Sequence, residues 1–316
     1  HMGKVRVSGP GAADFVNSCF TNDLKRIEPG KAQYTMCCAP DGGVIDDLIQ
    51  YLRSDEDVLL VPNAANATEV AELLTAEAAD RAPGVTVSDE HTQHGIIAVQ
   101  GPKADEVMAE LGLPTDHPDF MSFLDAQWEG HEVVVCRSGY TGEKGYEIIC
   151  PWDATPALWE ALVAAAEERG GLPAGLGARD TLRTEMGYPL HGHELSREIS
   201  PVMARNAWAV GWDKESFWGS EALAEQRAAK SGRLNRGLKV TGRGIPREGN
   251  EIKDSEGTVI GVVTSGTFSP TLGHGIGIAL VDRSHTFGDQ VVIDVRGREV
   301  PAELVKPPFV EAGVRA

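Results

Sequence analysis

The sequence predicts an α+β fold, with two related α+β units that carry antiparallel sheets and a C-terminal all-β barrel or roll. A strand, a Gly-Pro turn and a helix follow one another at residues 5–20, and the same order recurs at residues 96–111. Further alternating segments and a closing helix follow each of these. After Arg236 the pattern changes to short alternating segments between Gly-rich turns.

The elements can be expected in chain order from these patterns. In the first unit we expect a strand at 5–8 that breaks at Gly9-Pro10, a helix at 11–20, strands at 32–38, 44–52 and 58–61, and a helix at 68–79. In the second unit, Gly101 takes the place of Gly9. Its expected strands are 96–99, 132–137 and 146–150, and its expected helices are 104–111 and 154–169.

Two more helices and a run of strands complete the chain. The helices are expected at 177–187 and 222–231, and the C-terminal strands at 237–240, 258–265, 275–281, 290–295 and 300–305. A length of 316 residues exceeds what one hydrophobic core usually spans. We therefore predict a first unit at 1–92, a second unit with its following helices at 93–220, a connecting helix at 221–235 and the barrel domain at 236–312.

Composition excludes several classes of protein. No apolar run approaches the roughly 20 residues that span a bilayer, so we expect no membrane protein. A net charge of -18 and a pI near 4.9 argue against nucleic-acid or anionic-lipid binding. The five cysteines include the adjacent Cys37 and Cys38 and form no Cys-x-x-Cys pair. With no secretory signal in the sequence, a reducing cytoplasmic location is expected.

Two adjacent aspartates interrupt an otherwise apolar predicted strand, which reads Gly42-Gly43-Val44-Ile45-Asp46-Asp47-Leu48-Ile49-Gln50-Tyr51. Strand side chains alternate between faces, so the two are expected on opposite faces, Asp46 with Val44, Leu48 and Gln50 and Asp47 with Ile45, Ile49 and Tyr51. At least one carboxylate should be hydrogen-bonded, have a raised pKa or meet the positive charge of a ligand. The alternative is one aspartate in water at an edge and one that caps a turn.

Other polar residues are candidates for the same pocket. Tyr34 and Asn63 could line it, although each also fits a rim or turn position. Glu147 follows a Gly-rich connection and could accept two parallel N–H bonds from an amidine-like edge such as a pterin offers. Arg179 lies in the first turn of a helix, where it suits a carboxylate or a polar heterocycle, while Arg179 or Arg183 could instead form a structural salt bridge.

Other catalytic chemistries find little support. The pair His191 and His193 has no nearby cysteine and no flanking pair of carboxylates, so we expect no metal site. The sequence has no nucleophile elbow and no redox pair of cysteines.

Several segments together resemble the glycine-cleavage T-protein family, in the order in which the family has them. They are the aspartate run above, Val99-Gln100-Gly101-Pro102, Gly139-Tyr140-Thr141-Gly142-Glu143, Gly177-Ala178-Arg179-Asp180-Thr181-Leu182-Arg183 and Thr264-Ser265-Gly266-Thr267-Phe268-Ser269-Pro270. The resemblance covers nearly the whole chain. It implies three domains around a central funnel that holds tetrahydrofolate.

The resemblance also implies the activity. A one-carbon unit would pass from the aminomethyl-dihydrolipoyl arm of lipoylated H-protein to tetrahydrofolate, giving 5,10-methylene-tetrahydrofolate, ammonia and the dihydrolipoyl arm. Asp47 matches the key acidic residue, which would stabilise the iminium that develops on the carbon. Glu147 and Arg179 match residues that grip the pterin edge. The remaining matches border the folate or hydrogen-bond it: Tyr34, Tyr51, Asn63 and Tyr140.

Two other functions fit the same fold. One is a folate-dependent demethylase of a small methylated compound, because fold alone does not fix function. The other is a folate-binding regulatory protein without transferase activity, although its Lys-Gly-Cys-Tyr-type motif has no counterpart at residues 138–142. H-protein is expected to be acidic, so its docking on this acidic chain would require a local basic patch.

Overall fold

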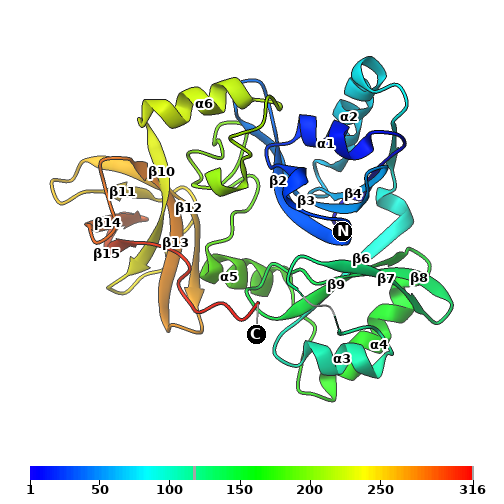
Figure 1. The fold of residues 1–316 in the computed structure, drawn as a ribbon. Helices are drawn as coiled ribbons and strands as arrows, with labels where there is room; N and C mark the ends of the chain where they lie inside the picture. The colour runs from blue at the N-terminus through cyan, green and yellow to red at the C-terminus, as the bar shows by residue number, and fades with distance from the viewer. Residues whose placement is uncertain (117–118, 315–316) are drawn as a thin grey trace.

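The computed structural model describes residues 1–116 and 119–314, with a β-barrel on one side and two α+β units on the other (Figure 1). The first unit has a five-stranded antiparallel sheet in the order β2-β3-β4-β1-β5. Its elements are β1 (Val5–Ser8), α1 (Ala12–Cys19), β2 (Lys31–Cys38), β3 (Val44–Ser54), β4 (Asp57–Val61), α2 (Ala67–Arg81) and β5 (Thr86–Asp89).

The second unit repeats this plan with a four-stranded antiparallel sheet in the order β6-β9-β8-β7. Its elements are β6 (His94–Gln100), α3 (Ala104–Glu110), β7 (Phe123–Trp128), β8 (His131–Cys136), β9 (Gly145–Pro151) and α4 (Thr155–Glu167). The two units share the turn that follows their first strand. Gly9 and Gly101 have φ angles of 111° and 133°, which side chains disfavour, and each carbonyl accepts the first N–H of the next helix.

The two sheets turn their helix-free faces toward each other. In the first unit, alternate residues such as Leu48 and Leu60 pack under α1 and α2. Their neighbours, including Tyr51 and Leu59, instead meet Ile149 of the second sheet in a shared apolar cluster. Each sheet is therefore covered on both faces. Polar residues at the interface between the two units are held in place by contacts with both sheets.

A closed six-stranded barrel follows the two units, and α5 (Leu176–Met186) lies between the barrel and the second sheet (Figure 1). The strands of the barrel are β10 (Arg233–Val240), β11 (Glu251–Lys253), β12 (Val259–Ser269), β13 (His274–Asp282), β14 (Gln290–Val295) and β15 (Arg298–Val305). The helix α6 (Ser220–Ala229) precedes the barrel. This arrangement confirms the predicted fold class, and the predicted domain boundaries stay predictions.

The structure corrects the expected strand pattern in two ways. Ile45 does not share the face of Ile49 and Tyr51 but packs with Leu48 under the helices. The cause is a β-bulge, because Cys38 pairs with Val44 and Cys37 with Asp46, which leaves Ile45 as an extra residue. Three strands were also not predicted, namely β5, β7 and β11.

No helix within residues 1–116 and 119–314 is long and apolar enough to cross a membrane.

Candidate active site

Asp47 lies at the centre of a hydrogen-bonded group built on two neighbouring strands. Met36 of β2 is its cross-strand partner, so Tyr34, two residues away, lies on the same face of the sheet. The Tyr34 hydroxyl donates to Asp47 Oδ2 at 2.9 Å. Asn63, two residues after the end of β4, donates its side-chain amide to Asp47 Oδ1 at 3.0 Å and to the Asp47 carbonyl at 2.9 Å. Three residues predicted for the site are thus in direct contact.

The surroundings of Asp47 affect its ionisation in two opposite ways. Its side chain is partly exposed, whereas that of Asp46 is fully buried. Desolvation raises the pKa of Asp47 above its usual value, and the hydrogen bond from Tyr34 opposes that rise. Burial also raises the pKa of Tyr34 well above its usual range, so this hydroxyl keeps its proton and stays a donor. Both oxygens of Asp47 accept hydrogen bonds, which suits the ionised form.

Glu147 and Tyr51 are joined through Ser138, which follows β8. The Ser138 hydroxyl donates to Glu147 Oε2 at 2.6 Å, and the Tyr51 hydroxyl lies 3.3 Å from Ser138 Oγ. Because the one hydroxyl proton of Ser138 is donated to Glu147, the Tyr51 hydroxyl must be the donor to Ser138 Oγ. Tyr51 itself is buried and therefore orients Ser138 and Glu147 from beneath.

Arg179 and Tyr140 form the next group. The Arg179 guanidinium lies over the Tyr140 ring at 4.6 Å, and Tyr188 stacks beside Tyr140 with ring centroids 5.8 Å apart. The Tyr140 hydroxyl donates to the Pro189 carbonyl. Burial raises the pKa of Tyr140, and the nearby negative charge of Asp47 adds to the rise. The charges of both Asp47 and Arg179 thus act on the pKa of Tyr140, in opposite directions.

Arg183, one turn further along α5, is structural. Its guanidinium is buried, donates to Asp180 Oδ1 at 2.6 and 2.9 Å, and donates to Glu194 Oε2 at 2.8 Å. A further bond of 2.7 Å reaches Ser265 of β12. Of the two arginines, Arg183 is therefore the one that forms the structural salt bridge, and it docks α5 onto the barrel.

Glu147 and Arg179 line one open cavity of about 710 Å³. Its walls include apolar side chains of β6 and α4 and the polar side chains of Gln100, Thr141, Lys103 and Arg169, whereas Asp47 does not line this cavity. A carboxylate, a guanidinium and an apolar wall in one cavity fit a flat heterocycle with a polar edge.

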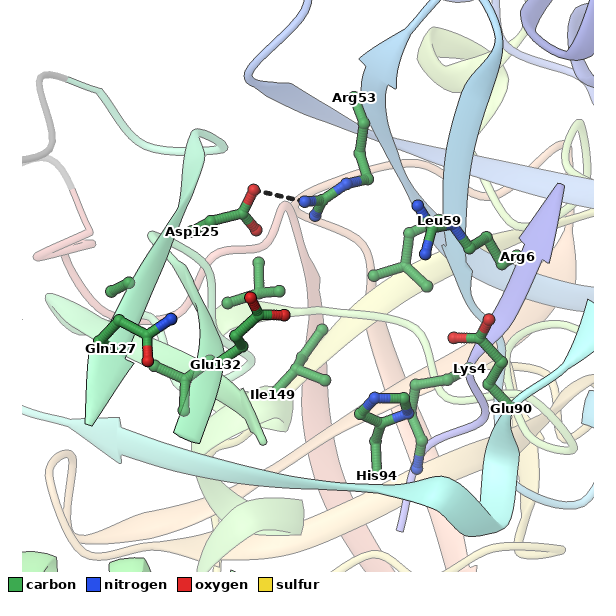
Figure 2. A pocket seen from close by; sticks show the side chains of 13 residues that line it. Lys4, Arg6, Arg53, Leu59, Glu90, His94, Asp125, Gln127, Glu132 and Ile149 are labelled. Carbon is green, nitrogen blue, oxygen red and sulfur yellow. Dashed lines mark hydrogen bonds and ion pairs between the residues drawn. The ribbon is translucent and has the colours of Figure 1, made fainter. Parts of the chain in front are cut away.

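A second cavity, of about 350 Å³, lies between the two sheets and contains none of the predicted site residues (Figure 2). One ion pair within its lining joins Arg53 to Asp125, and Arg6 pairs with Asp57 outside the lining. We assign this cavity no role in the activity.

Several residues at the site were not predicted from the sequence. Asn206 donates to the Tyr34 hydroxyl at 3.3 Å, and the Trp208 ring, 65% exposed, stacks on Tyr34. His191, considered above only as a metal ligand, contacts the Val44 carbonyl instead. Within the described part of the chain, no three His, Cys, Asp or Glu side chains are grouped as metal ligands. An isolated asparagine or serine in a loop gives no sequence signal for these contacts.

Known protein families match nearly the whole chain. The family model described as GCVT N-terminal domain matches residues 1–214, and the Glycine cleavage T-protein C-terminal barrel domain matches residues 233–311. An aminomethyltransferase from Frankia alni is 60% identical over 315 residues, which are 100% of this chain and 85% of that protein. The aminomethyltransferase of Mycobacterium tuberculosis is 54% identical over 317 residues, with the same shares covered.

A solved structure agrees with these matches. The glycine cleavage system aminomethyltransferase T from Bartonella henselae superposes with a TM-score of 0.91 at 32% identity, over 99% of this chain and 85% of that one. Both domain models and this structure point to one class of protein, with two α+β units followed by a barrel. The chain belongs to the glycine cleavage T-protein family, which confirms the family predicted from the sequence.

Proposed function

We propose that this chain is the aminomethyltransferase of a glycine cleavage system. It moves the one-carbon unit from the aminomethyl-dihydrolipoyl arm of H-protein to tetrahydrofolate, and the products are 5,10-methylene-tetrahydrofolate, ammonia and the dihydrolipoyl arm. Identities of 60% and 54% to aminomethyltransferases across the whole chain support this activity. The observation that carries it is the carboxylate of Asp47, fixed by Tyr34 and Asn63 where it keeps partial access to ligands.

Asp47 stabilises the positive charge that develops on the carbon during transfer. Tyr34 and Asn63 hold its two oxygens before any substrate arrives, so little reorganisation is needed when the charge appears. The same carboxylate can accept a hydrogen bond from an N–H of the folate and so orient the attacking nitrogen. Its desolvated surroundings strengthen both interactions relative to water.

The remaining predicted residues fit tetrahydrofolate as the acceptor substrate. Ser138 holds one oxygen of Glu147, and in the described residues no protein donor holds the other, which can accept N–H groups of a pterin edge. Arg179 is held over Tyr140 by its cation–π contact and can donate to a carbonyl or carboxylate of the folate. Tyr51 acts through Ser138, and Tyr34 and Asn63 act through Asp47.

A basic patch offers the acidic H-protein a docking surface on this acidic chain. The guanidinium groups of Arg205 and Arg236 both lie 5.2 Å from the centre of the Phe287 ring. Burial lowers the pKa of Arg236, the positive charges of Arg205 and Arg283 lower it further, and the negative charge of Asp289 opposes them. Arg205 is exposed and directly precedes Asn206, whose side chain contacts Tyr34. We therefore propose that H-protein docks on Arg205, Arg283 and the exposed Trp208, where its arm can reach Asp47.

The reaction takes place in the cytoplasm in this proposal. All five cysteines are free and buried, which suits a reducing compartment.

The test has two steps. Tetrahydrofolate should raise the melting temperature of the protein, and ammonia and methylene-tetrahydrofolate should then form only when aminomethylated, lipoylated H-protein is added. Transfer from a small methylated amine or sulfur compound without H-protein would contradict the proposal and indicate a demethylase. Folate binding without any turnover would indicate a regulatory protein, and no folate-induced shift would contradict every folate-dependent function.

A further inference from the structure

We propose that Asp46, the first aspartate of the pair, is a positioning residue that holds Asp47 in place through the amide of Asn63. The inference rests on the proposed function of Asp47. Asp46 is fully buried, so it does not touch the ligands itself, and its carboxylate serves neighbouring groups of the protein.

The Asp46 carboxylate grips Asn63 at two points. Its Oδ2 accepts the Asn63 backbone N–H at 3.0 Å, and its Oδ1 accepts the Asn63 side-chain amide at 2.8 Å. That same amide is the donor to Asp47 Oδ1 at 3.0 Å and to the Asp47 carbonyl at 2.9 Å. The position of the donor that holds Asp47 therefore depends on Asp46, although the two carboxylates share no hydrogen bond with each other.

Asn66 and His191 hold Asp46 in turn. Asn66 is the N-cap residue of α2, yet its side chain makes no capping bond and donates to Asp46 Oδ1 at 2.7 Å. It also lies 3.2 Å from His191 Nδ1, while His191 Nε2 lies 3.1 Å from the Val44 carbonyl. Since the amide of Asn66 donates, Nδ1 must accept and Nε2 must carry the proton. The chain of contacts runs from His191 to Asn66, Asp46, Asn63 and Asp47.

The energetic cost of burying the Asp46 carboxyl group argues against a role in packing alone. Within the described residues no Lys or Arg forms an ion pair with Asp46, and burial raises its pKa to about 7. The titratable groups nearest to it are Asp47 on its own strand and the Cys37 thiol on β2, while His191 on the loop is connected to it through Asn66. An apolar residue would fill the same space in a strand without this penalty.

Gln50 provides a matched control. It lies on the same strand as Asp46, is also fully buried, and donates one hydrogen bond of 2.8 Å to Gln33. It has no hydrogen bond to Asn63, Asn66 or Asp47 in the described structure. Loss of Gln50 therefore measures what a buried polar residue of this strand contributes to stability alone.

The experiment compares Asp46→Asn, Asn66→Ala and Gln50→Ala with the wild-type enzyme. Each is measured for kcat, for the KM of tetrahydrofolate, for the pH profile of kcat and for thermal unfolding. Asp46→Asn should keep the bonds to its Oδ1 and lose the one to the Asn63 backbone N–H. We expect its kcat to fall about tenfold to a hundredfold, since displacement of a catalytic group by about 1 Å has effects of this size. The KM should change less than about twofold, because the folate-binding side chains stay in place.

The pH profile separates positioning from a general loss of structure. Burial and the negative charge of Asp47 raise the pKa of Asp46 to about 7, so ionisation of Asp46 should contribute to the acidic limb of the profile. That limb should move to lower pH when Asp46→Asn removes this charge. Asn66→Ala should lower kcat without removing that charge, and Gln50→Ala should lower the melting temperature without changing kcat or the acidic limb.

Two results would overturn the proposal. One is a kcat within about twofold of wild type in folded Asp46→Asn. The other is a loss of activity in Asp46→Asn that matches its unfolded fraction, as in Gln50→Ala, with an unmoved acidic limb. If wild-type enzyme forms no methylene-tetrahydrofolate, the proposed function fails first and this inference fails with it. If the wild-type enzyme is active but these variants do not show the expected changes in kcat and pH profile, only this inference fails and the proposed function stands.

Discussion

Replacement of Asp47 by asparagine should separate catalysis from folding. Asparagine has the shape of aspartate, so its Oδ1 can still accept the 3.0 Å bond from Asn63. Its amide would face Tyr34, whose hydroxyl can accept as well as donate and already receives a bond from Asn206 at 3.3 Å. Both neighbours can therefore keep their places, and the change removes mainly the negative charge.

The expected loss follows from that charge. A preorganised group that stabilises a developing charge contributes on the order of 3 kcal/mol, so kcat should fall roughly a hundredfold. Binding of tetrahydrofolate should persist because Glu147 and Arg179 are untouched. Stability should not fall: burial raises the pKa of Asp47, so ionisation of this group in the wild type costs stability as pH rises through that pKa. Asparagine removes this cost, and its advantage should grow as pH rises from about 4, the ordinary pKa of an aspartate, to the raised pKa of Asp47.

The assay follows methylene-tetrahydrofolate at saturating aminomethylated H-protein, with thermal unfolding of the same samples at several pH values. Asp41→Asn serves as a matched control, because Asp41 lies in the exposed turn just before β3 and forms no bond to the Asp47 group in the described structure. Near-normal turnover of Asp47→Asn would refute the assigned role. An equal loss in both variants would show that the assay reports on the strand and not on the carboxylate.

Three further results are expected. Glu147→Gln should weaken folate binding by about 1.5–3 kcal/mol, the usual contribution of hydrogen bonds to a charged group, and a folate-induced thermal shift as large as in wild type would contradict the role. Arg205→Glu should lower kcat/KM for H-protein while KM for folate stays constant, and the difference from wild type should shrink as the salt concentration rises. A difference that does not change with salt concentration would argue against charge-guided docking. Glu194→Gln should destabilise the protein by about 1.5–3 kcal/mol in denaturant unfolding, because buried Arg183 loses its buried carboxylate partner and keeps only Asp180; a loss under about 1 kcal/mol would refute this.

The sequence predicted the secondary-structure elements better than the contacts between them. Period-two and helical patterns located most elements because each buries one face, and the aspartate pair stood out because charge interrupts an apolar strand. β11 spans only three residues, and β7 carries Asp125 and Gln127 on an exposed face, so neither has a strong apolar pattern. The bulge at Ile45 depends on pairing with β2, which local pattern does not encode.

The supporting contacts of the site could not be predicted for a similar reason. Asn66 and His191 are 125 positions apart, and Tyr34 and Asn206 are 172 apart. Such contacts depend on how the two sheets and the following loops pack, whereas single polar residues in loops are compatible with many roles. The residue patterns and the resemblance to a family both pointed to Glu147 and Arg179, but neither gave an indication of Ser138 or Asn206.

The segment at residues 188–196 touches every part of the molecule. The Pro189 carbonyl receives Tyr140 of the second unit, His191 reaches Val44 of the first, and His193 Nδ1 lies 2.9 Å from the Thr264 carbonyl of the barrel. A hinge between any two of these parts would have to break this shared connection. Substrates should therefore enter and products leave through fixed openings, and a single protease cut in this segment should abolish turnover while leaving the separate sheets and the barrel folded.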